Sequence, residues 1–302
     1  MEPSWQIPET IGKRLRARYG AAVESWLASL PETMATLALR WSLEFGDPIG
    51  RGNSSVVWRC RRDDGAGAVL KMIPEPRIAQ TEARALRVWE PSGRVPKVFD
   101  HDPAVGALLL EAIPNESPLS ERDGGVPLSD VGDLIGGLHR TEFPVGDHDV
   151  VTLAEGVERM FSLWTSRSEH NRGVAEIVPI GRVNQGLQLA QKLAMYQADI
   201  VLLHGDLHPG NVLDGGETRG LMAIDPRPCI GDPAFDAVDW VFWPVDDPQN
   251  WEPRCSELAK ILGVDGERLW DWCRSVASML AGNTAQRGGS PDRLDAFLAM
   301  AP

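Results

Sequence analysis

The stretch VLLHGDLHPGNVL, residues 201–213, decides the fold and leads to the function of this chain. An apolar run ends in a polar loop, and a second apolar run follows Asn211. The loop contains two histidines, an aspartate and an asparagine, and Asp206 and Asn211 lie five positions apart. This pattern predicts a strand–loop–strand element whose loop presents polar side chains.

The residue types in this loop suit phosphoryl transfer. Asp206 and Asn211 have the spacing of the catalytic base and the metal-binding asparagine in the catalytic loop of kinases. Asp206 can accept the proton of a substrate hydroxyl, and Asn211 offers Mg²⁺ a hard oxygen ligand. Asp225 ends a second apolar run, 221–224, fourteen residues after Asn211, and is the expected second metal ligand. Two short strands, each ending in such a group, would bring the three side chains to one edge.

Each of these residues, taken alone, also has an ordinary structural explanation, because aspartate and asparagine are common in turns. The ordered set in its strand–loop–strand context favours chemistry. His204 is interpreted as a structural residue that holds the loop by hydrogen bonds. His208 either orients the loop or lies at the surface beside Pro209.

A second set of candidates lies within residues 45–112, which the pattern predicts to be a small sheet with one inserted helix. The segment 47–58 resembles a strand–loop–strand cover for phosphates. Gly50 and Gly52 would let the backbone approach phosphate oxygens, and Ser55 stands where a third glycine is common. Taken alone, this segment is explained better by an ordinary hairpin.

Lys71 strengthens the phosphate interpretation. It lies in the apolar strand predicted at 67–72, where a lysine is costly unless it is paired. A nucleotide phosphate and a nearby carboxylate would both satisfy it. Glu82, on the following helix, is the preferred partner, although it could be a solvated helix charge, and Glu75 is the alternative.

The run 107–113 precedes the predicted boundary between two lobes. Its backbone around Glu111 and Ile113 is expected to offer an adenine base its hydrogen bonds, on position alone. Residues 115–127 are rich in Pro, Ser and Gly. We therefore predict a helical arm and nucleotide-binding lobe over 1–113 and a helical catalytic and acceptor-binding lobe over 114–302.

Within these lobes the apolar spacing predicts the following elements. The arm 1–44 should be helical, with a break at Leu30–Pro31 and a second helix that begins at Pro31. Short strands are expected at 95–99, 107–110, 201–203 and 221–224. Helices of the second lobe are expected at 128–140, 152–167, 180–198, 234–243, 253–262, 266–282 and 291–300.

Bulk composition excludes several classes of protein. The formal net charge of −13 over 302 residues disfavours a nucleic-acid substrate and is compatible with a cationic one. Four scattered cysteines favour neither a zinc site nor a disulfide framework and fit a reducing cytoplasm. No apolar run is long enough to cross a membrane. Nothing in the sequence indicates an obligate protein partner.

The motifs HGDLHPGNVL (204–213), AIDP (223–226) and GDPAFD (231–236) together resemble the aminoglycoside phosphotransferase family. Homoserine, choline and fructosamine kinases share parts of this trio. The run IDPRP (224–228), the Trp-rich tail and the Trp-containing N-terminal helices are most similar to the streptomycin 6-phosphotransferase and hydroxyurea kinase branch. The resemblance is sharp over 201–236 and weaker over 50–113.

The resemblance implies an α+β, protein-kinase-like bilobal fold, with ATP and Mg²⁺ in the cleft. It implies Asp206 as base and Asn211 and Asp225 as metal ligands, in an enzyme that phosphorylates a hydroxyl of a streptomycin-type aminoglycoside and so confers resistance. In GDPAFD, Asp232 has the chemistry of a helix N-cap, and Asp236 could brace the catalytic loop.

Three interpretations of the function remain open at this point. The first is the aminoglycoside kinase. The second is a kinase of the same fold that acts on hydroxyurea or a small metabolite, and the third is a silent nucleotide-binding module. Acids and tryptophans after the loop could bind a cationic sugar, or they could be a solvated face and core: Asp236, Asp239, Asp246, Asp247, Glu252, Trp240, Trp243 and Trp251.

Overall fold

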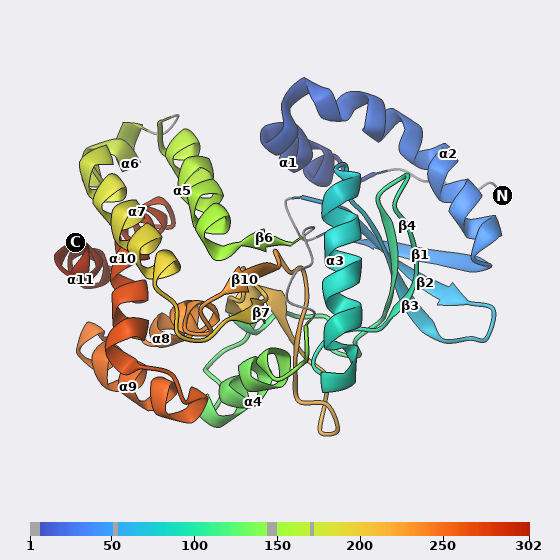
Figure 1. The fold of residues 1–302 in the computed structure, drawn as a ribbon. Coiled ribbons are helices and arrows are strands. Elements are labelled where there is room, and N and C mark those ends of the chain that lie inside the picture. Colours follow the sequence, from blue (N-terminus) through green and yellow to red (C-terminus); the bar gives the residue numbers. More distant parts are fainter. Residues whose placement is uncertain (1–6, 51–53, 144–149, 170–171) are drawn as a thin grey trace. The chain divides into compact units, whose positions relative to one another are not determined.

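A computed structural model describes residues 7–50, 54–143, 150–169 and 172–302. The chain forms two compact units. The N-terminal unit contains Met1–Glu90 and Val95–Glu116, and the C-terminal unit contains Pro91–Arg94 and Ser117–Pro302. The predicted α+β class is confirmed, because the first unit is built on an antiparallel sheet and the second is mainly helical (Figure 1).

The sheet of the N-terminal unit has five antiparallel strands in the order β1-β2-β3-β5-β4. Its strands are β1 (Leu43–Ile49), β2 (Val56–Arg62), β3 (Gly67–Met72), β4 (Val98–Asp102) and β5 (Ala107–Glu111). The tight turn between β2 and β3 contains Gly65, whose positive φ of 79° suits glycine. In this strand order β3 is central, with β2 on one side and β5 on the other, and its residue Lys71 pairs with Val57 of β2 and Leu108 of β5.

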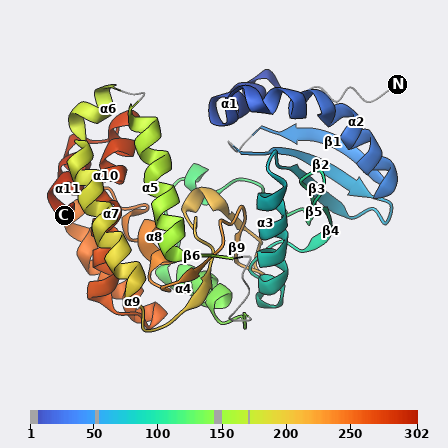
Figure 2. The same ribbon diagram turned by 45° about the horizontal axis from the view of Figure 1, so that its top comes forward.

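Helices cover this sheet. Helix α1 (Glu9–Tyr19), the 3₁₀ helix η1 (Gly20–Val23) and α2 (Glu24–Arg40) form a core with Trp58 and Leu70 of the sheet (Figure 2). Side chains alternate along a strand, so Lys71 points to the opposite face from Leu70. Helix α3 (Pro76–Trp89), next to β4 and β5, supplies the partner of Lys71 there.

The predicted helix boundary at Leu30–Pro31 is wrong. Pro31 lies inside α2, and the helices are separated instead at Gly20, which has a positive φ of 62°. A proline inside a helix costs about 3 kcal/mol. Burial of the stripe Leu30, Met34 and Leu37, which continues across the proline, offsets that cost.

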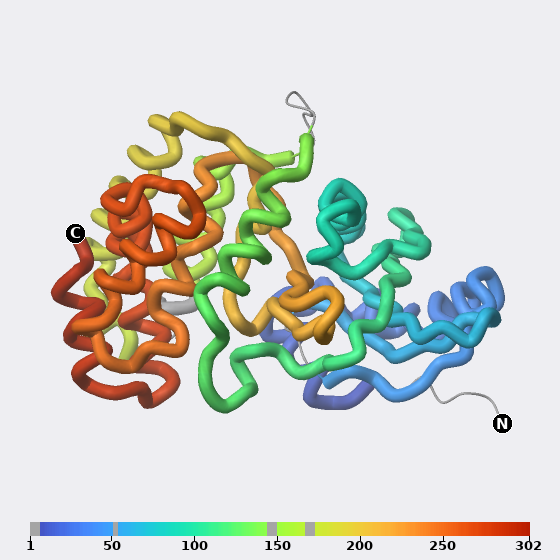
Figure 3. The backbone as a smooth tube through the Cα atoms, turned by 90° about the horizontal axis from the view of Figure 1, so that it is seen from below, coloured from blue at the N-terminus to red at the C-terminus, as the bar shows by residue number. Residues whose placement is uncertain are grey.

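The C-terminal unit surrounds the long helix α10 (Gly266–Gln286), which packs against α7 (Ile180–Met195), α11 (Pro291–Met300) and α9 (Trp251–Leu262) (Figure 3). The remaining helices are α4 (Leu128–His139), α5 (Leu153–Glu169), α6 (Arg172–Ile177) and α8 (Val238–Phe242). Short 3₁₀ helices elsewhere are η2 (Glu90–Ser92), η3 (Leu119–Glu121), η4 (Pro209–Asn211), η5 (Phe235–Ala237) and η6 (Pro248–Asn250). The sequence pattern missed α6, and it predicted one helix over 234–243, where η5 and α8 follow each other.

Short strands flank the loop 204–211. The strands β6 (Val151–Thr152), β10 (Cys229–Gly231) and β7 (Val201–Leu203) form one sheet, and β8 (Val212–Asp214) pairs with β9 (Leu221–Ala223) in another. The two strands predicted to end in catalytic groups, β7 and β9, therefore belong to different sheets. Along the described ranges, no helix is long and apolar enough to cross a membrane.

Candidate active site

The loop between β7 and β8 closes on itself through Asn211. The Asn211 side chain donates from Nδ2 to the backbone carbonyl of Asp206 at 2.9 Å and to Asp206 Oδ2 at 3.3 Å. Asn211 is buried, whereas the Asp206 side chain is 47% exposed. The five-residue spacing seen in the sequence thus produces a direct contact, with an accessible carboxylate beside a fixed amide.

Asp225 reaches the same loop through backbone hydrogen bonds. The N–H of Ile224 donates to the carbonyl of Asn211 at 2.9 Å, which extends the β8–β9 ladder by one residue. Asp225 then has a φ of 59°, a left-handed conformation that non-glycine residues rarely adopt. Such strain is concentrated at functional sites, because only the surrounding structure can maintain it.

His204 ties the two segments together, as predicted. It is fully buried, its Nε2 donates to the carbonyl of Ile224 at 3.0 Å, and its own carbonyl accepts from the N–H of Arg227 at 2.8 Å. Burial lowers the pKa of His204, so the ring stays neutral. The backbone on both sides of Asp225 is therefore fixed to the start of the loop 204–211.

The donor atoms of this region fit a magnesium ion. Asn211 uses Nδ2 to hold the loop, which leaves its side-chain oxygen as the ligand atom. Asp225 offers carboxylate oxygens, and Mg²⁺ prefers such hard donors. The assignment of Asn211 and Asp225 as ligands stays a prediction.

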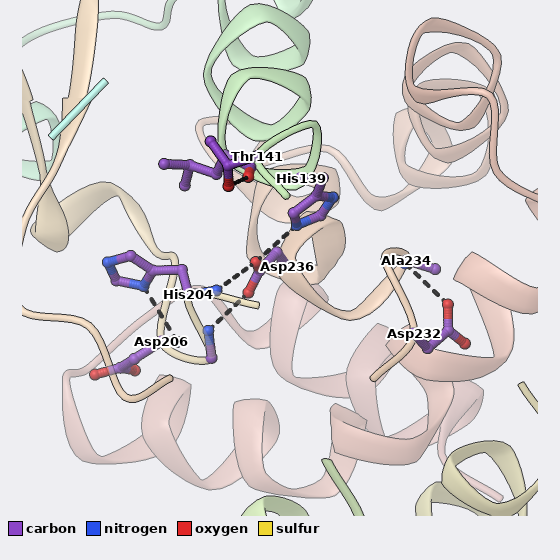
Figure 4. Close-up of polar contacts among 9 residues, drawn as sticks. His139, Thr141, His204, Asp206, Asp232, Ala234 and Asp236 are labelled. Atoms are coloured by element: carbon purple, nitrogen blue, oxygen red, sulfur yellow. Dashed lines mark hydrogen bonds and ion pairs between the residues drawn. The ribbon is translucent and has the colours of Figure 1, made fainter. Parts of the chain in front are cut away.

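Asp236 braces the loop from behind (Figure 4). Its carboxylate accepts the backbone N–H of His204 at 2.8 Å and of Gly205 at 2.9 Å, and His139 Nε2 lies 3.0 Å away. Burial alone would raise the pKa of Asp236, but the hydrogen bond and charge of His139, with the N–H of Gly205, hold it below the usual value. The predicted bracing contact is confirmed, and His139 is a partner that the sequence analysis missed.

Asp232 has a structural part in the same segment. Its carboxylate accepts the N–H of Ala234 at 3.0 Å, the capping geometry expected for it (Figure 4). It also accepts the indole N–H of Trp272 at 2.7 Å and contacts Arg268. Asp232 therefore fastens the segment to α10.

His208 both orders the loop and lies at the surface, the two alternatives that the sequence left open. Its Nδ1 accepts the N–H of Gly210 at 3.0 Å, which caps η4 and orders the loop. Its ring is nevertheless 41% exposed, with Nε2 at 3.9 Å from Asp206 Oδ1. His208 thus lies at the surface beside the predicted base.

In the N-terminal unit, Lys71 and Glu82 form a buried ion pair. Lys71 Nζ lies 2.6 and 2.7 Å from the two oxygens of Glu82, and the side chains are 5% and 2% exposed. This is the partner preferred from the sequence, while Glu75 instead occupies the N-cap position of α3. The role of the pair toward a nucleotide stays a prediction.

For the other residues predicted to bind a nucleotide, the structure gives less information than for Lys71 and Glu82. At Gly50 an added Cβ would meet nothing within 4 Å, so the protein itself does not demand glycine there. Ser55 and Ile113 are buried, and Gly52 lies outside the described residues. The N–H of Glu111 donates to the carbonyl of Lys97 at 2.9 Å, so this N–H belongs to the sheet.

The acids and tryptophans that follow the loop do not gather into one binding site for a cationic sugar. Trp240 and Trp251 are buried core, as the structural alternative expected. The Asp246 side chain is fully exposed, and Asp247 caps η6. Asp239 is half-buried on α8. Unlike Asp246 and Asp247, it has a pKa that is affected by the charges of Asp206 and His208.

Comparison with known proteins points in one direction. Residues 40–288 match the family model described as aminoglycoside/hydroxyurea antibiotic resistance kinase. The chain is 29% identical to the streptomycin 6-kinase of Streptomyces glaucescens, covering 88% of this chain and 87% of that protein. It is 30% identical to the hydroxyurea phosphotransferase of Kitasatospora aureofaciens, covering 85% and 74%.

A solved structure shares the fold. The spectinomycin phosphotransferase in complex with ADP and spectinomycin aligns with a TM-score of 0.52 at 15% identity, covering 89% of this chain and 92% of that one. At this identity the likeness shows the fold alone. The predicted kinase-like fold is therefore confirmed.

Proposed function

Because this chain belongs to the aminoglycoside/hydroxyurea antibiotic resistance kinase family, we propose that it transfers the γ-phosphoryl group of ATP to a hydroxyl of a streptomycin-type aminoglycoside. The observation that carries the proposal is the contact between Asp206 and Asn211, in a loop braced by Asp236. An exposed carboxylate on a braced loop, beside a fixed side-chain amide, is what a general base for a bound hydroxyl requires.

In this reaction the acceptor oxygen forms a bond to the γ-phosphorus while its proton passes to Asp206. The bond between that phosphorus and the bridging oxygen of ADP breaks, and Asp206 later returns the proton to water. Asn211 and Asp225 would hold Mg²⁺, which neutralises charge on the phosphate oxygens. His204 and Asp236 keep the loop backbone fixed, so little reorganisation is needed during transfer.

The N-terminal unit would bind the nucleotide. We assign Lys71, oriented by Glu82, to the α- and β-phosphates. Gly50, Gly52 and Ser55 would cover the phosphates, and the backbone around Glu111 and Ile113 would meet the adenine. The ADP in the spectinomycin phosphotransferase structure supports ATP as the donor.

Hydroxyurea is the second candidate acceptor, since the hydroxyurea phosphotransferase is as similar to this chain as the streptomycin 6-kinase. The net charge of −13 favours a cationic acceptor over a neutral one. Phosphorylation of the drug would confer resistance in the host cell.

An ATP-consumption assay with a panel of acceptors tests the proposal. The panel contains streptomycin, other aminoglycosides, hydroxyurea, choline and homoserine, with mass spectrometry of each product. We expect turnover and a phosphorylated product with streptomycin. Turnover with neutral acceptors only would contradict the aminoglycoside assignment, and no turnover with any acceptor would favour a silent nucleotide-binding module.

A further inference from the structure

Helix α1 contacts both ends of the segment that joins β1 to β2. Arg14 donates from Nη2 to the backbone carbonyl of Gly50 at 2.6 Å, directly after β1 ends. The hydroxyl of Tyr19 donates to the backbone carbonyl of Ser54 at 3.1 Å, shortly before β2 begins. Figure 2 shows the end of β1 beneath this helix. Two side chains of one helix therefore hold the chain on either side of residues 51–53, which lie outside the described ranges.

The packing of α1 gives these contacts a firm base. Ile11 and Leu15 are buried in the core that the helix shares with β2 and β3. Residues four apart lie on one face of a helix, so their burial fixes the rotation of α1 about its axis. Arg14 follows Ile11 by three positions, and Tyr19 follows Leu15 by four. The packing that buries the apolar stripe therefore also determines where the two donors lie.

The contact at Ser54 fixes the direction of a backbone donor. The bond between Ser54 and Ser55 is not among the cis peptide bonds of the described residues, so it is trans. In a trans peptide the C=O and the N–H point in opposite directions. Because Tyr19 holds the carbonyl of Ser54, the N–H of Ser55 is directed away from the Tyr19 hydroxyl. Backbone N–H groups held in one direction in a turn are suitable donors for phosphate oxygens.

Arg14 also has a charge that the described part of the chain does not balance. No carboxylate of these residues pairs with it, and its Nε is buried without a hydrogen-bond partner. By contrast, Arg16 of the same helix lies 2.7 Å from Glu24. A buried donor without a partner is unfavourable, and a nearby anion would reduce that cost. The guanidinium at Gly50 therefore favours the approach of negatively charged phosphates to this end of β1.

We propose that Arg14 and Tyr19 are positioning residues for the nucleotide. They hold the backbone at Gly50 and Ser55 in the conformation that receives the phosphates, and Arg14 adds positive charge there. The inference rests on the proposed function, in which Gly50 and Ser55 cover the phosphates, and it gives the N-terminal helix a part in ATP binding. A helix that served packing alone would contribute to stability and leave the affinity for ATP unchanged.

Calorimetric titration of the full-length protein with the non-hydrolysable imido analogue of ATP, in the presence of Mg²⁺, tests the inference without an acceptor. Tyr19→Phe removes only a hydroxyl and should raise the Kd for the analogue about three- to tenfold, as expected for one lost hydrogen bond. Arg14→Met should raise it by about tenfold or more, and Arg14→Lys should recover part of the loss because it restores the charge. Arg16→Met, a change on the same helix at an arginine paired with Glu24, is the matched control and should bind as the wild type does.

Titration with adenosine, which lacks phosphates, distinguishes positioning from a general loss of structure. Its Kd should stay within about twofold of the wild-type value in every variant, because the assigned contacts are to the phosphates. If the wild type binds the ATP analogue and both Tyr19→Phe and Arg14→Met bind it equally well, the inference fails alone. An equal rise in the Kd for adenosine would also overturn it, because α1 would then only stabilise the unit. If the wild type binds neither compound, the inference and the proposed function fail together.

Discussion

The Asn211 side chain holds Asp206 twice, through the backbone carbonyl at 2.9 Å and the carboxylate at 3.3 Å. Asn211, a predicted metal ligand, is therefore in direct contact with the predicted base. The backbone carbonyl of Asn211 also accepts the N–H of Ile224, so the same residue links the loop to the segment of Asp225.

Asn211→Ala should raise the Mg²⁺ concentration needed for half-maximal turnover by about 10–100-fold, the usual range for groups that shape a metal site. The variant loses the predicted metal ligand and the side-chain contact with Asp206. A magnesium titration of the initial rate measures the effect. Asn250→Ala removes an exposed asparagine from the same unit and should titrate as the wild type; an unchanged Mg²⁺ requirement in Asn211→Ala would remove Asn211 from the metal site.

Asp236→Asn should lower the free energy of unfolding by about 2–3 kcal/mol, because hydrogen bonds to a buried charged group are lost. The lowered pKa of Asp236 means that its contribution is fully present above the usual aspartate value and disappears as the pH falls through the folded-state pKa. Urea unfolding at several pH values should therefore show the difference from wild type narrowing below about pH 4. A constant difference would show that charge has no part in the bracing.

Glu82→Gln should destabilise the protein by about 3–5 kcal/mol, because it leaves the buried Lys71 charge without its counterion. The double variant Lys71→Met with Glu82→Leu should recover much of that loss, while the KM for ATP stays raised. Unfolding and ATP kinetics on the single and double variants separate stability from binding. Normal ATP kinetics in the double variant would contradict the nucleotide assignment of Lys71.

Asp239→Asn should stabilise the free protein at neutral pH by on the order of 1–3 kcal/mol. The folded-state pKa of about 6 lies above the ordinary aspartate pKa of 3.8, so ionisation of Asp239 costs the folded protein stability as the pH rises between these values. The gain should be full above about pH 6 and absent below about pH 4. Thermal unfolding across this range measures it, and a destabilised variant at pH 7.5 would show that Asp239 has a partner in the fold.

The sequence was sufficient to predict which side chains meet in the loop, because those contacts are local. Residues 204–211 form one short loop, so their types and spacing nearly determine which groups meet. The predicted family is confirmed for the same reason, since its motifs lie in the loop and the two segments that follow it. The bracing by Asp236 was predictable from its position one turn after a capping aspartate.

Other features depend on tertiary packing and were not predictable. Helix α2 continues through Pro31 because a buried stripe on both sides outweighs the missing hydrogen bond. His139 contacts Asp236 from a helix almost a hundred residues earlier in the chain, and no local sequence pattern predicts that contact. Asp239 resembled four other acids in the sequence, and only its surroundings distinguish it.

Replacement of Asp206 tests the central claim most directly. Asp206→Asn keeps the size of the side chain and the backbone carbonyl that Asn211 contacts, but it cannot accept the proton of the acceptor hydroxyl. Single-turnover transfer from ATP to streptomycin should slow by about 10²–10⁴-fold, with binding of both substrates retained. A rate close to that of the wild type would contradict the account, because phosphoryl transfer would then proceed without Asp206 as its base.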